Sequence, residues 1–572
     1  MLKCVTFNNS PTIFFSKKEE PPLAVKDRFK ILLAVHYRGI ICIIVPLLAL
    51  VVLLPFPPEP HQWTAYCLII MAIFWLSECI PLPVTSFLPI IIFPLTGVAS
   101  TTDVCMAYVN DSVFMFLGSL ILAYSVEQSG LHKRLAYCAI RAIGYSHLKL
   151  LSAMCIVTTF VSMWITNTAA TTMMVPINFA VLKVFEDQKL IRIYETNSVG
   201  EQVASDITTC YFCTATFSAT IGGIGTLVGT ATNLVFKGLF VTQYPNAPEL
   251  LSFPKFSAFG VPYMILLDIF MLLYMCVVYI GVLRPKSEVA KKSKISPEGM
   301  KAAKMAVNAD YARLGKITFW EYMVIILFGG AMVAFFCRSP QLFPGWGDLI
   351  NDYFELKDEK FVRDSALAAL VAFMMFLLPS NLSFFKNCKA KFYEDLPKTR
   401  VPSVLNWKKL ITELPYSFTF LLGGGFALSD AARKTGLNQK IGEFLQELKI
   451  LPNIIILLIL IIFVVLITNI ASNVAVCNVL APISMQLAKE IGQNPLWYVI
   501  ASGFSSSYCF MFPVGTPGNL VVQSAAKIPT TKMIKAGLGP TLSTIIITWL
   551  FVYFYAPIIW PELHSMPEWA KS

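Results

Sequence analysis

The stretch WITNTAATTMMVP spans residues 164–176, and a second stretch, IASNVAVCNVLAP, spans residues 470–482. Each places an asparagine, Asn167 or Asn473, directly after a hydroxyl residue, and each reaches a proline nine residues later. Apolar sequence surrounds both stretches. Asparagine, serine and threonine weaken a helix because their side chains compete for backbone hydrogen bonds. The recurrence of these residues in the same order indicates one structural device that the chain uses twice.

The composition around these stretches is that of a membrane protein. The 572 residues are 56% hydrophobic and 14% charged, with a mean hydropathy of +0.65, whereas soluble domains are about a quarter charged. Uncharged apolar runs occupy residues 39–56, 454–468 and 541–555. About ten to twelve stretches reach the roughly 17–25 residues that a spanning helix needs. The chain is therefore predicted to be an all-α polytopic membrane protein.

The charge distribution predicts how the chain is oriented. Although the net charge is +11, the basic residues gather in loops, with nine in residues 284–316 and seven in residues 381–413. The loop 338–363 is acidic, and the C-terminal tail is nearly free of basic residues. Because basic loops stay cytoplasmic, we expect the N-terminus and both basic loops inside and the C-terminus outside. Such termini require an odd number of crossings.

Further motifs repeat in register with the opening pair. Gly118 aligns with Gly424 at the same offset of 306 that relates Asn167 to Asn473. The motif GTATN at residues 229–233 matches GTPGN at residues 515–519 at an offset of 286. Three motif pairs in the same order indicate a duplicated unit. The Gly-rich stretches of the first pair are expected to break their apolar segments and to reverse the chain as hairpins, over residues 112–140 and 415–445.

Paired helix interruptions in corresponding positions of two halves point to a transporter site near the bilayer midplane. Unwound backbone frees carbonyl oxygens for a small cation, and a helix N-terminus carries partial positive charge that suits an anion. Any one such motif also fits simple helix packing, where small and hydroxyl residues are common. Duplication of three motifs in register favours the binding site.

With these residues, the chain resembles the divalent anion/sodium symporter family, which includes animal Na⁺-coupled di- and tricarboxylate transporters and the insect Indy-like carboxylate transporters. The resemblance covers residues 39–559 and includes FWLSECIPLPVTSFLP at residues 74–89, GGIGTLVGTATN at 222–233, LLGGGFAL at 421–428 and FPVGTPGN at 512–519. It implies an inverted-repeat transporter with about eleven transmembrane helices, two re-entrant hairpins, and a scaffold with a moving transport domain of the elevator type. It also implies a homodimer in the plasma membrane, with succinate, citrate and related carboxylates as substrates.

The resemblance also implies the site residues. Two or more Na⁺ ions would be held at two symmetric sites, formed by Ser162, Asn167 and the backbone of Gly229, and by Thr468, Asn473 and the backbone of Gly515. The substrate would contact Thr166, Asn167, Thr168, Thr230, Ser472, Asn473, Val474, Thr516 and Pro517.

The family signature is a Ser-Asn-Thr triplet in each half, and this chain departs from it at Thr166 and Val474. Val474 cannot hydrogen-bond a carboxylate, so we expect the first half to hold the substrate more tightly and the substrate to be larger than a bare oxyanion. None of the site residues is Lys or Arg, so bound Na⁺ would supply the charge that compensates a dianion.

The domain organisation follows from these patterns. The expected parts are a cytoplasmic segment 1–38, a first membrane half 39–283, a basic cytoplasmic loop 284–318, a second membrane half 319–560 and an extracellular tail 561–572.

Other functions fit the sequence less well. An enzyme is not expected, since the five histidines have no metal-ligand spacing and the common catalytic motifs are missing. A channel, a sulfate transporter and a Na⁺-independent carboxylate exchanger remain alternatives. Glu78 is an additional intramembrane carboxylate, with either a functional or a structural role.

Overall fold

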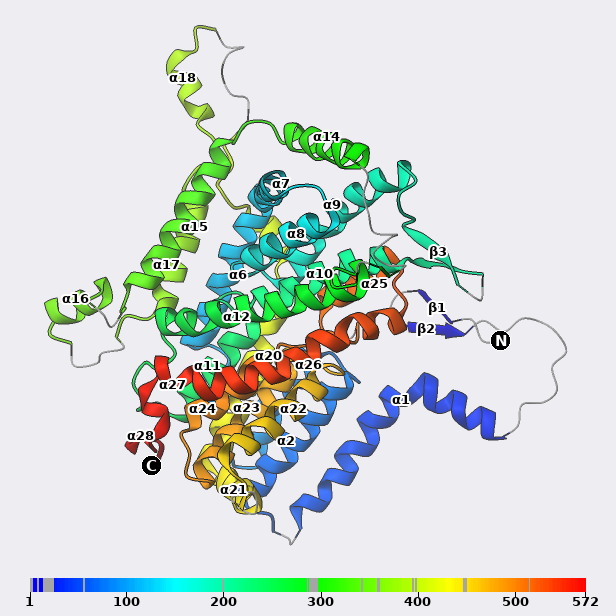
Figure 1. Cartoon of the computed structure of the whole chain (residues 1–572). Coiled ribbons are helices and arrows are strands. Elements are labelled where there is room, and N and C mark those ends of the chain that lie inside the picture. Colours follow the sequence, from blue (N-terminus) through cyan, green and yellow to red (C-terminus); the bar gives the residue numbers. More distant parts are fainter. Residues whose placement is uncertain are drawn as a thin grey trace.

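The computed structural model describes residues 4–7, 10–13, 25–54, 57–197, 200–284, 286–287, 297–340, 343–356, 361–392, 396, 399–445, 450–513 and 515–571. Lys17 and Lys18 of the expected N-terminal segment and residues 288–296 of the basic loop lie outside these ranges. The described chain is a bundle of helices (Figure 1). Its strands form two small antiparallel pairs, β1 (Cys4–Phe7) with β2 (Ser10–Ile13) and β3 (Tyr194–Thr196) with β4 (Gln202–Ala204).

The helices of the first half follow one another with short connections. They are α1 (Val25–Ala49), η1 (Leu50–Leu53), α2 (Pro60–Ser77), α3 (Leu82–Thr85), α4 (Leu88–Leu95), α5 (Thr101–Met106), α6 (Asp111–Ser129), α7 (Leu131–Ile143), α8 (His147–Ser162), α9 (Asn167–Asp187), α10 (Asp206–Gly222), α11 (Ala231–Gln243), α12 (Phe253–Met275) and the π-helix η2 (Cys276–Ile280).

Helix α14 (Pro297–Arg313) lies inside the basic loop and precedes the second half. The second half contains α15 (Phe319–Cys337), α16 (Trp346–Tyr353), α17 (Asp364–Leu377), η3 (Ser383–Phe385), α18 (Lys386–Lys389), α19 (Trp407–Glu413), α20 (Ser417–Lys434), α21 (Leu437–Leu445), α22 (Asn453–Thr468), α23 (Asn473–Glu490), α24 (Pro495–Ser505), α25 (Pro517–Ala526), α26 (Thr530–Phe554) and α27 (Ala556–Ile559). The C-terminal tail follows with η6 (Pro561–His564) and α28 (Glu568–Lys571).

Six helical stretches in the described chain are long and apolar enough to cross a membrane. They are Val35–Leu53, Thr101–Ser129, Asn167–Asp187, Phe253–Ile280, Phe319–Cys337 and Thr530–Ile559. Shorter apolar helices include α8, α17 and α22. Two of these helices, α8 and α22, are short because they end just before the two repeated stretches at residues 164–176 and 470–482. Helices satisfy their own backbone hydrogen bonds, which apolar surroundings require, so the all-α membrane architecture expected from the composition is confirmed.

The two halves repeat the same succession of elements, and they interlock. Helices α6 to α12 correspond in order to α20 to α26. Helix α17 of the second half packs against α6 of the first half, and α2 of the first half packs against α20 of the second. Each half therefore contributes a helix that covers part of the other half. Helices α15 and α17 form an arm that projects from the bundle, while α1 lies apart from the centre (Figure 1).

The expectation about the Gly-rich stretches was wrong. Gly118 lies inside α6 and Gly423–Gly425 lie inside α20, and both helices continue through them. The chain reverses later, at Gly130 and Gly436, whose φ angles of 74° and 77° are in the left-handed region that glycine adopts without strain. Within the helices, the glycines instead allow neighbouring elements to approach closely. A Cβ on Gly118 would lie 2.5 Å from the Cβ of Ala368 in α17, and one on Gly424 would meet Ser86.

Candidate functional site

The first predicted site lies where α8 ends and α9 begins. Thr166 caps α9, and its hydroxyl accepts a hydrogen bond from the Ala169 amide at 3.3 Å. The hydroxyl oxygen of Ser162, the last residue of α8, lies 3.0 Å from Asn167 Oδ1 and 2.6 Å from the carbonyl oxygen of Ala219 in α10. Because a hydroxyl donates one proton, its lone pairs remain available on the other side. The helix break predicted at this motif is therefore present, and three oxygens gather at it.

The segment between α10 and α11 closes over this cluster. Gly223 approaches Asn167 so closely that a Cβ would lie 2.4 Å from Asn167 Oδ1, and a Cβ on Gly229 would lie 2.5 Å from the carbonyl oxygen of Gly223. The Asn233 side chain donates to the carbonyls of Gly223 at 2.9 Å and Thr226 at 2.7 Å. Asn233 thereby holds the segment that carries Gly229 and Thr230 against the end of α8.

The second predicted site repeats this arrangement. The hydroxyl oxygen of Thr468, at the end of α22, lies 2.8 Å from Asn473 Oδ1 and 2.6 Å from the carbonyl oxygen of Ser506. A Cβ on Gly515 would lie 2.6 Å from the Thr468 carbonyl oxygen. The structure thus brings Thr468, Asn473 and Gly515 together, as it does Ser162, Asn167 and Gly229.

The second half also repeats the pair of hydrogen bonds by which Asn233 clamps its segment. The Asn519 side chain donates to the carbonyls of Cys509 and Phe512, both at 3.0 Å. These three residues follow Asn233, Gly223 and Thr226 at the offset of 286 that relates GTATN to GTPGN. No role for the two clamping asparagines was predicted from the sequence, although the shared offset was the signal that could have identified them.

The remaining predicted substrate contacts sit at four helix N-termini. Thr166, Thr230, Ser472 and Thr516 are the N-caps of α9, α11, α23 and α25. Thr168 is half-buried, whereas Val474 is 7% exposed and Pro517 is exposed. The described residues of the two triplets share no hydrogen bond with each other.

The two halves are joined through neighbouring residues instead. Thr216 of α10 donates to Asn519 Oδ1 at 3.0 Å, and the Ser507 hydroxyl donates to Thr232 of α11 at 3.0 Å. Helix α25 packs against α9, and α11 packs against α23. The helices that begin at the predicted substrate contacts therefore pack against the other half of the chain.

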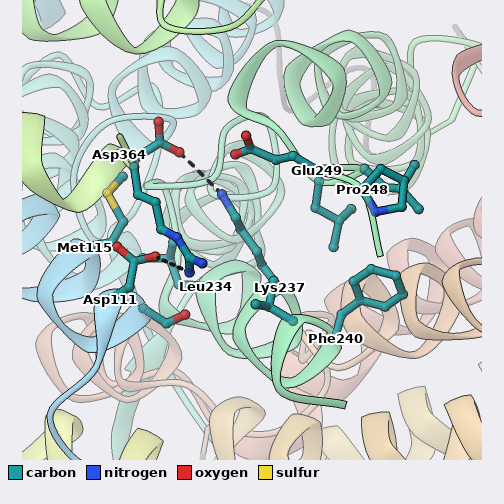
Figure 2. A pocket seen from close by; sticks show the side chains of 13 residues that line it. Asp111, Met115, Leu234, Lys237, Phe240, Pro248, Glu249 and Asp364 are labelled. Atoms are coloured by element: carbon teal, nitrogen blue, oxygen red, sulfur yellow. Dashed lines mark hydrogen bonds and ion pairs between the residues drawn. The ribbon is translucent and has the colours of Figure 1, made fainter. Parts of the chain in front are cut away.

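A charged pocket lies alongside α11, which lines it with Leu234, Lys237, Phe240 and Val241 (Figure 2). Lys237 Nζ lies 3.4 Å from Asp364 Oδ2, and Arg363 Nη1 lies 3.6 Å from Asp111 Oδ2. Arg338, deeper in the protein, contacts Asp364 at 2.5 Å and also pairs with Glu249. Burial alone would lower the pKa of Arg338, but these two carboxylates outweigh it and raise the pKa. The network ties α17 to α6 and α11.

Comparisons with known proteins agree with this architecture. The chain is 36% identical to the protein "I'm not dead yet" of Drosophila melanogaster over 98% of this chain and 95% of that protein. It is 31% identical to "Solute carrier family 13 member 2" of Homo sapiens, over 94% of this chain and 95% of that protein. It is also 31% identical to the "Na(+)/citrate cotransporter" of Rattus norvegicus, over 92% and 95%.

A family comparison covers nearly all of the described helices. Residues 35–561 match the family described as "Sodium:sulfate symporter transmembrane region". This range contains both oxygen clusters, both clamping asparagines and all four N-caps. The chain belongs to the sodium:sulfate symporter family.

Proposed function

We propose that the protein is a Na⁺-coupled secondary transporter of di- and tricarboxylates such as succinate and citrate. The observation that carries the proposal is the duplicated oxygen cluster, Ser162 with Asn167 and Thr468 with Asn473, each at a helix break and each closed by a clamped segment. The rat relative is by name a Na⁺/citrate cotransporter.

The donor atoms of each cluster suit Na⁺. Hydroxyl, amide and carbonyl oxygens are hard ligands, and unwound backbone carbonyls together with helix ends bind Na⁺ in inverted-repeat transporters. We assign one Na⁺ to Ser162, Asn167 and the Gly229 backbone, and a second to Thr468, Asn473 and the Gly515 backbone. Bound at these places, the ions would supply positive charge beside the substrate, which the neutral side chains there do not provide.

The substrate carboxylates would bind at the helix N-termini. The N-caps Thr166, Thr230, Ser472 and Thr516 offer hydroxyl and backbone N–H donors, and Asn167, Thr168, Asn473, Val474 and Pro517 complete the site. A carboxylate beside a helix N-terminus is favoured by the partial positive charge there. Without Na⁺ the dianion would lose hydration with no compensating cation, which links the uptake of substrate to the uptake of Na⁺.

The motion that we propose is an elevator. The arm of α15 and α17 would belong to a fixed scaffold that forms a homodimer, and the hairpins α6–α7 and α20–α21 would re-enter the membrane and move with the site. About eleven crossings would leave the N-terminus in the cytoplasm and the C-terminus outside the plasma membrane. The small residues Gly118 and Ala368 at the boundary between α6 and α17 support a sliding contact.

Uptake of radiolabelled succinate, citrate and sulfate into proteoliposomes tests the function, with choline replacing Na⁺ in a parallel series. We expect saturable carboxylate uptake that requires Na⁺ and is accelerated by substrate on the opposite side. A channel would show neither saturation nor this acceleration. Uptake of sulfate alone, or carboxylate uptake indifferent to Na⁺, would contradict the substrate or the coupling assignment, respectively.

Replacing either cluster asparagine tests the site. Asn167→Ala and Asn473→Ala each remove the amide oxygen that faces a helix-ending hydroxyl, so each is expected to abolish uptake while the protein still reaches the membrane. Asn406→Ala is the matched control, because Asn406 likewise lies at the start of a helix, as the N-cap of α19, but outside both clusters. The control should retain uptake, since loss of a cap costs only about 1 kcal/mol. Retained uptake in either cluster variant would show that the motif only packs helices.

A further inference from the structure

A carboxyl group outside the assigned Na⁺ sites lies half-buried among the helices of the first half. Asp268 is on α12, and the hydroxyl of Thr159 on α8 donates to its Oδ2 at 2.6 Å. The other oxygen, Oδ1, is buried and has no hydrogen-bond partner. On the outer face of α12 the neighbouring Ile265, Ile269 and Phe270 are exposed, as suits a surface against lipid. Water is therefore not available to solvate an ionised Asp268 from that side.

The surroundings of Asp268 contain few groups that could compensate a charge. Helix α8 contributes one titratable side chain, the thiol of Cys155, which is within hydrogen-bonding reach of Asp268, Thr159 and Ser218. Helix α10 contributes Ser218, whose buried hydroxyl oxygen also has no partner. Helices α15, α26 and α27 and the π-helix η2 also contact α12, but among the described residues no Lys, Arg or His forms an ion pair with Asp268. On α26, the basic side chain of Lys535 lies over the Tyr279 ring of η2.

The second half shows that the fold does not need this polar cluster. At the offset of 306, Cys155 and Thr159 correspond to Ile461 and Val465, and at the offset of 286 Ser218 corresponds to Phe504. Gly260 and Gly537 pack on equivalent carbonyls, those of Ile224 and Phe510, so Asp268 corresponds to Ile545. All four counterparts are apolar. A carboxyl group retained in only one of two equivalent positions indicates a function rather than a packing requirement.

The cluster adjoins the first assigned Na⁺ site. Thr159 and Ser162 are three residues apart and therefore neighbours on one face of α8. The Thr159 hydroxyl lies 3.4 Å from the carbonyl oxygen of Ser218, and the Ser162 hydroxyl lies 2.6 Å from that of Ala219, the next residue of α10. A charge on Asp268 would therefore act on a cation beside Ser162 at short range and through a protein interior of low dielectric constant.

We propose that Asp268 is a proton-binding site whose occupancy sets the Na⁺ affinity of the neighbouring cluster of Ser162 and Asn167. An ionised carboxylate that forms no ion pair with the described residues is costly away from water, and one proton on Oδ1 removes that cost. A proton fits the cluster better than a second hard cation does, because the thiol of Cys155 is a poor ligand for Na⁺. When the proton leaves to bulk water, the carboxylate attracts Na⁺ to the adjacent site. The inference rests on the Na⁺-coupled uptake proposed above.

The test measures the Na⁺ concentration for half-maximal succinate uptake between pH 7 and pH 9, where the carboxyl groups of succinate are ionised throughout. In the wild-type protein this concentration should fall roughly tenfold as pH rises, because an ionised Asp268 attracts the cation. In Asp268→Asn the side chain stays neutral at every pH, so the concentration should no longer depend on pH. Glu78→Gln, the same kind of change at the C-cap of α2, is the control and should keep the wild-type dependence.

Three outcomes would overturn the inference. An unchanged pH dependence in Asp268→Asn, with an equally steep Na⁺ dependence, would show that the group only packs. A less steep Na⁺ dependence in this variant, with the pH dependence intact, would show that Asp268 binds Na⁺ instead. If Asp268→Asn does not reach the membrane, the pH dependence of Thr159→Val is measured instead. Loss of the Thr159 hydroxyl, which donates to the ionised carboxylate, should move the midpoint of the pH dependence about one pH unit upward. An unmoved midpoint would contradict the proposal.

Absence of wild-type uptake of any carboxylate would instead overturn the proposed function and, with it, this inference. Wild-type uptake with unaltered behaviour of the Asp268 and Thr159 variants would overturn the inference alone.

Discussion

Gly223 is the residue on which the geometry of the first proposed Na⁺ site depends most directly. Its φ of −58° is in the right-handed helical region, so alanine would be tolerated by the backbone. Space is what excludes a side chain, because a Cβ there would lie 2.4 Å from Asn167 Oδ1. The requirement for glycine at this position is thus one of contact rather than of conformation.

Gly223→Ala is therefore expected to push Asn167 away from Ser162 and to raise the Na⁺ concentration for half-maximal uptake at least tenfold. Na⁺ titration of succinate uptake measures this change. Gly329→Ala is the control, since Gly329 lies in α15 and a Cβ added there would meet no heavy atom within 4 Å, and alanine favours a helix by about 1 kcal/mol. An equal effect of both substitutions would contradict a specific role for Gly223.

The residues of the site were largely accessible from the sequence. Duplication marked Asn167 and Asn473, and the family resemblance implied the hydroxyl residues five positions before them, which the structure places beside these asparagines. The partners on the opposite segment, such as the Ala219 carbonyl, were not predicted, because a backbone oxygen leaves no trace in residue type. Cys509, which occupies the place of Gly223 in the second half, was likewise missed, since the motif alignment began only at Gly229.

At the scale of elements, the positions of the helix breaks could be predicted, but the role of the glycines inside α6 and α20 could not. Glycine marks both chain reversal and close helix contact, and only the neighbouring helix distinguishes these two uses. Gly130 and Gly436 make the turns, while Gly118 accommodates α17, an element more than 200 residues away in sequence. Local sequence carries no information about that partner.

The arm helix α17 is fixed at its start by the buried ion-pair network. Arg338→Met would leave Asp364 and Glu249 without their shared partner, and breaking a buried pair from one side typically costs about 3–5 kcal/mol. We expect a clear fall in the thermal unfolding midpoint of the purified protein in detergent. The side chain of Arg338 is 4% exposed, whereas that of Arg433, which pairs with Asp430 one turn away, is 37% exposed. Arg433→Met should cost less than about 1 kcal/mol, and a comparable loss in both variants would argue against the network.

At the scale of the whole molecule, the contact between α6 and α17 joins the first hairpin to the arm of the second half. Gly118→Ala would place a methyl group 2.5 Å from the Cβ of Ala368. We expect this substitution to reduce the maximal rate of uptake several-fold. Ala368→Gly, introduced together with it, removes the opposing atom and should restore most of the rate.

Rescue in the double variant separates this contact from general damage to α6. Surface expression of the single and the double variant should be measured alongside uptake, because a helix that fails to pack would also lower the amount of protein. Failure of Ala368→Gly to rescue Gly118→Ala would place the defect elsewhere.

The interlocking of the two halves has a consequence for how the chain is made. Synthesis proceeds from the N-terminus, so α6 emerges and enters the membrane long before α17, the helix that covers it, has been translated. At about 5–20 residues per second the wait is on the order of tens of seconds. During that time the small-residue face of α6 must be shielded by lipid or by the insertion machinery. A ribosome that stalls before α17 would release a first half in which the face of α6 around Gly118 has no partner.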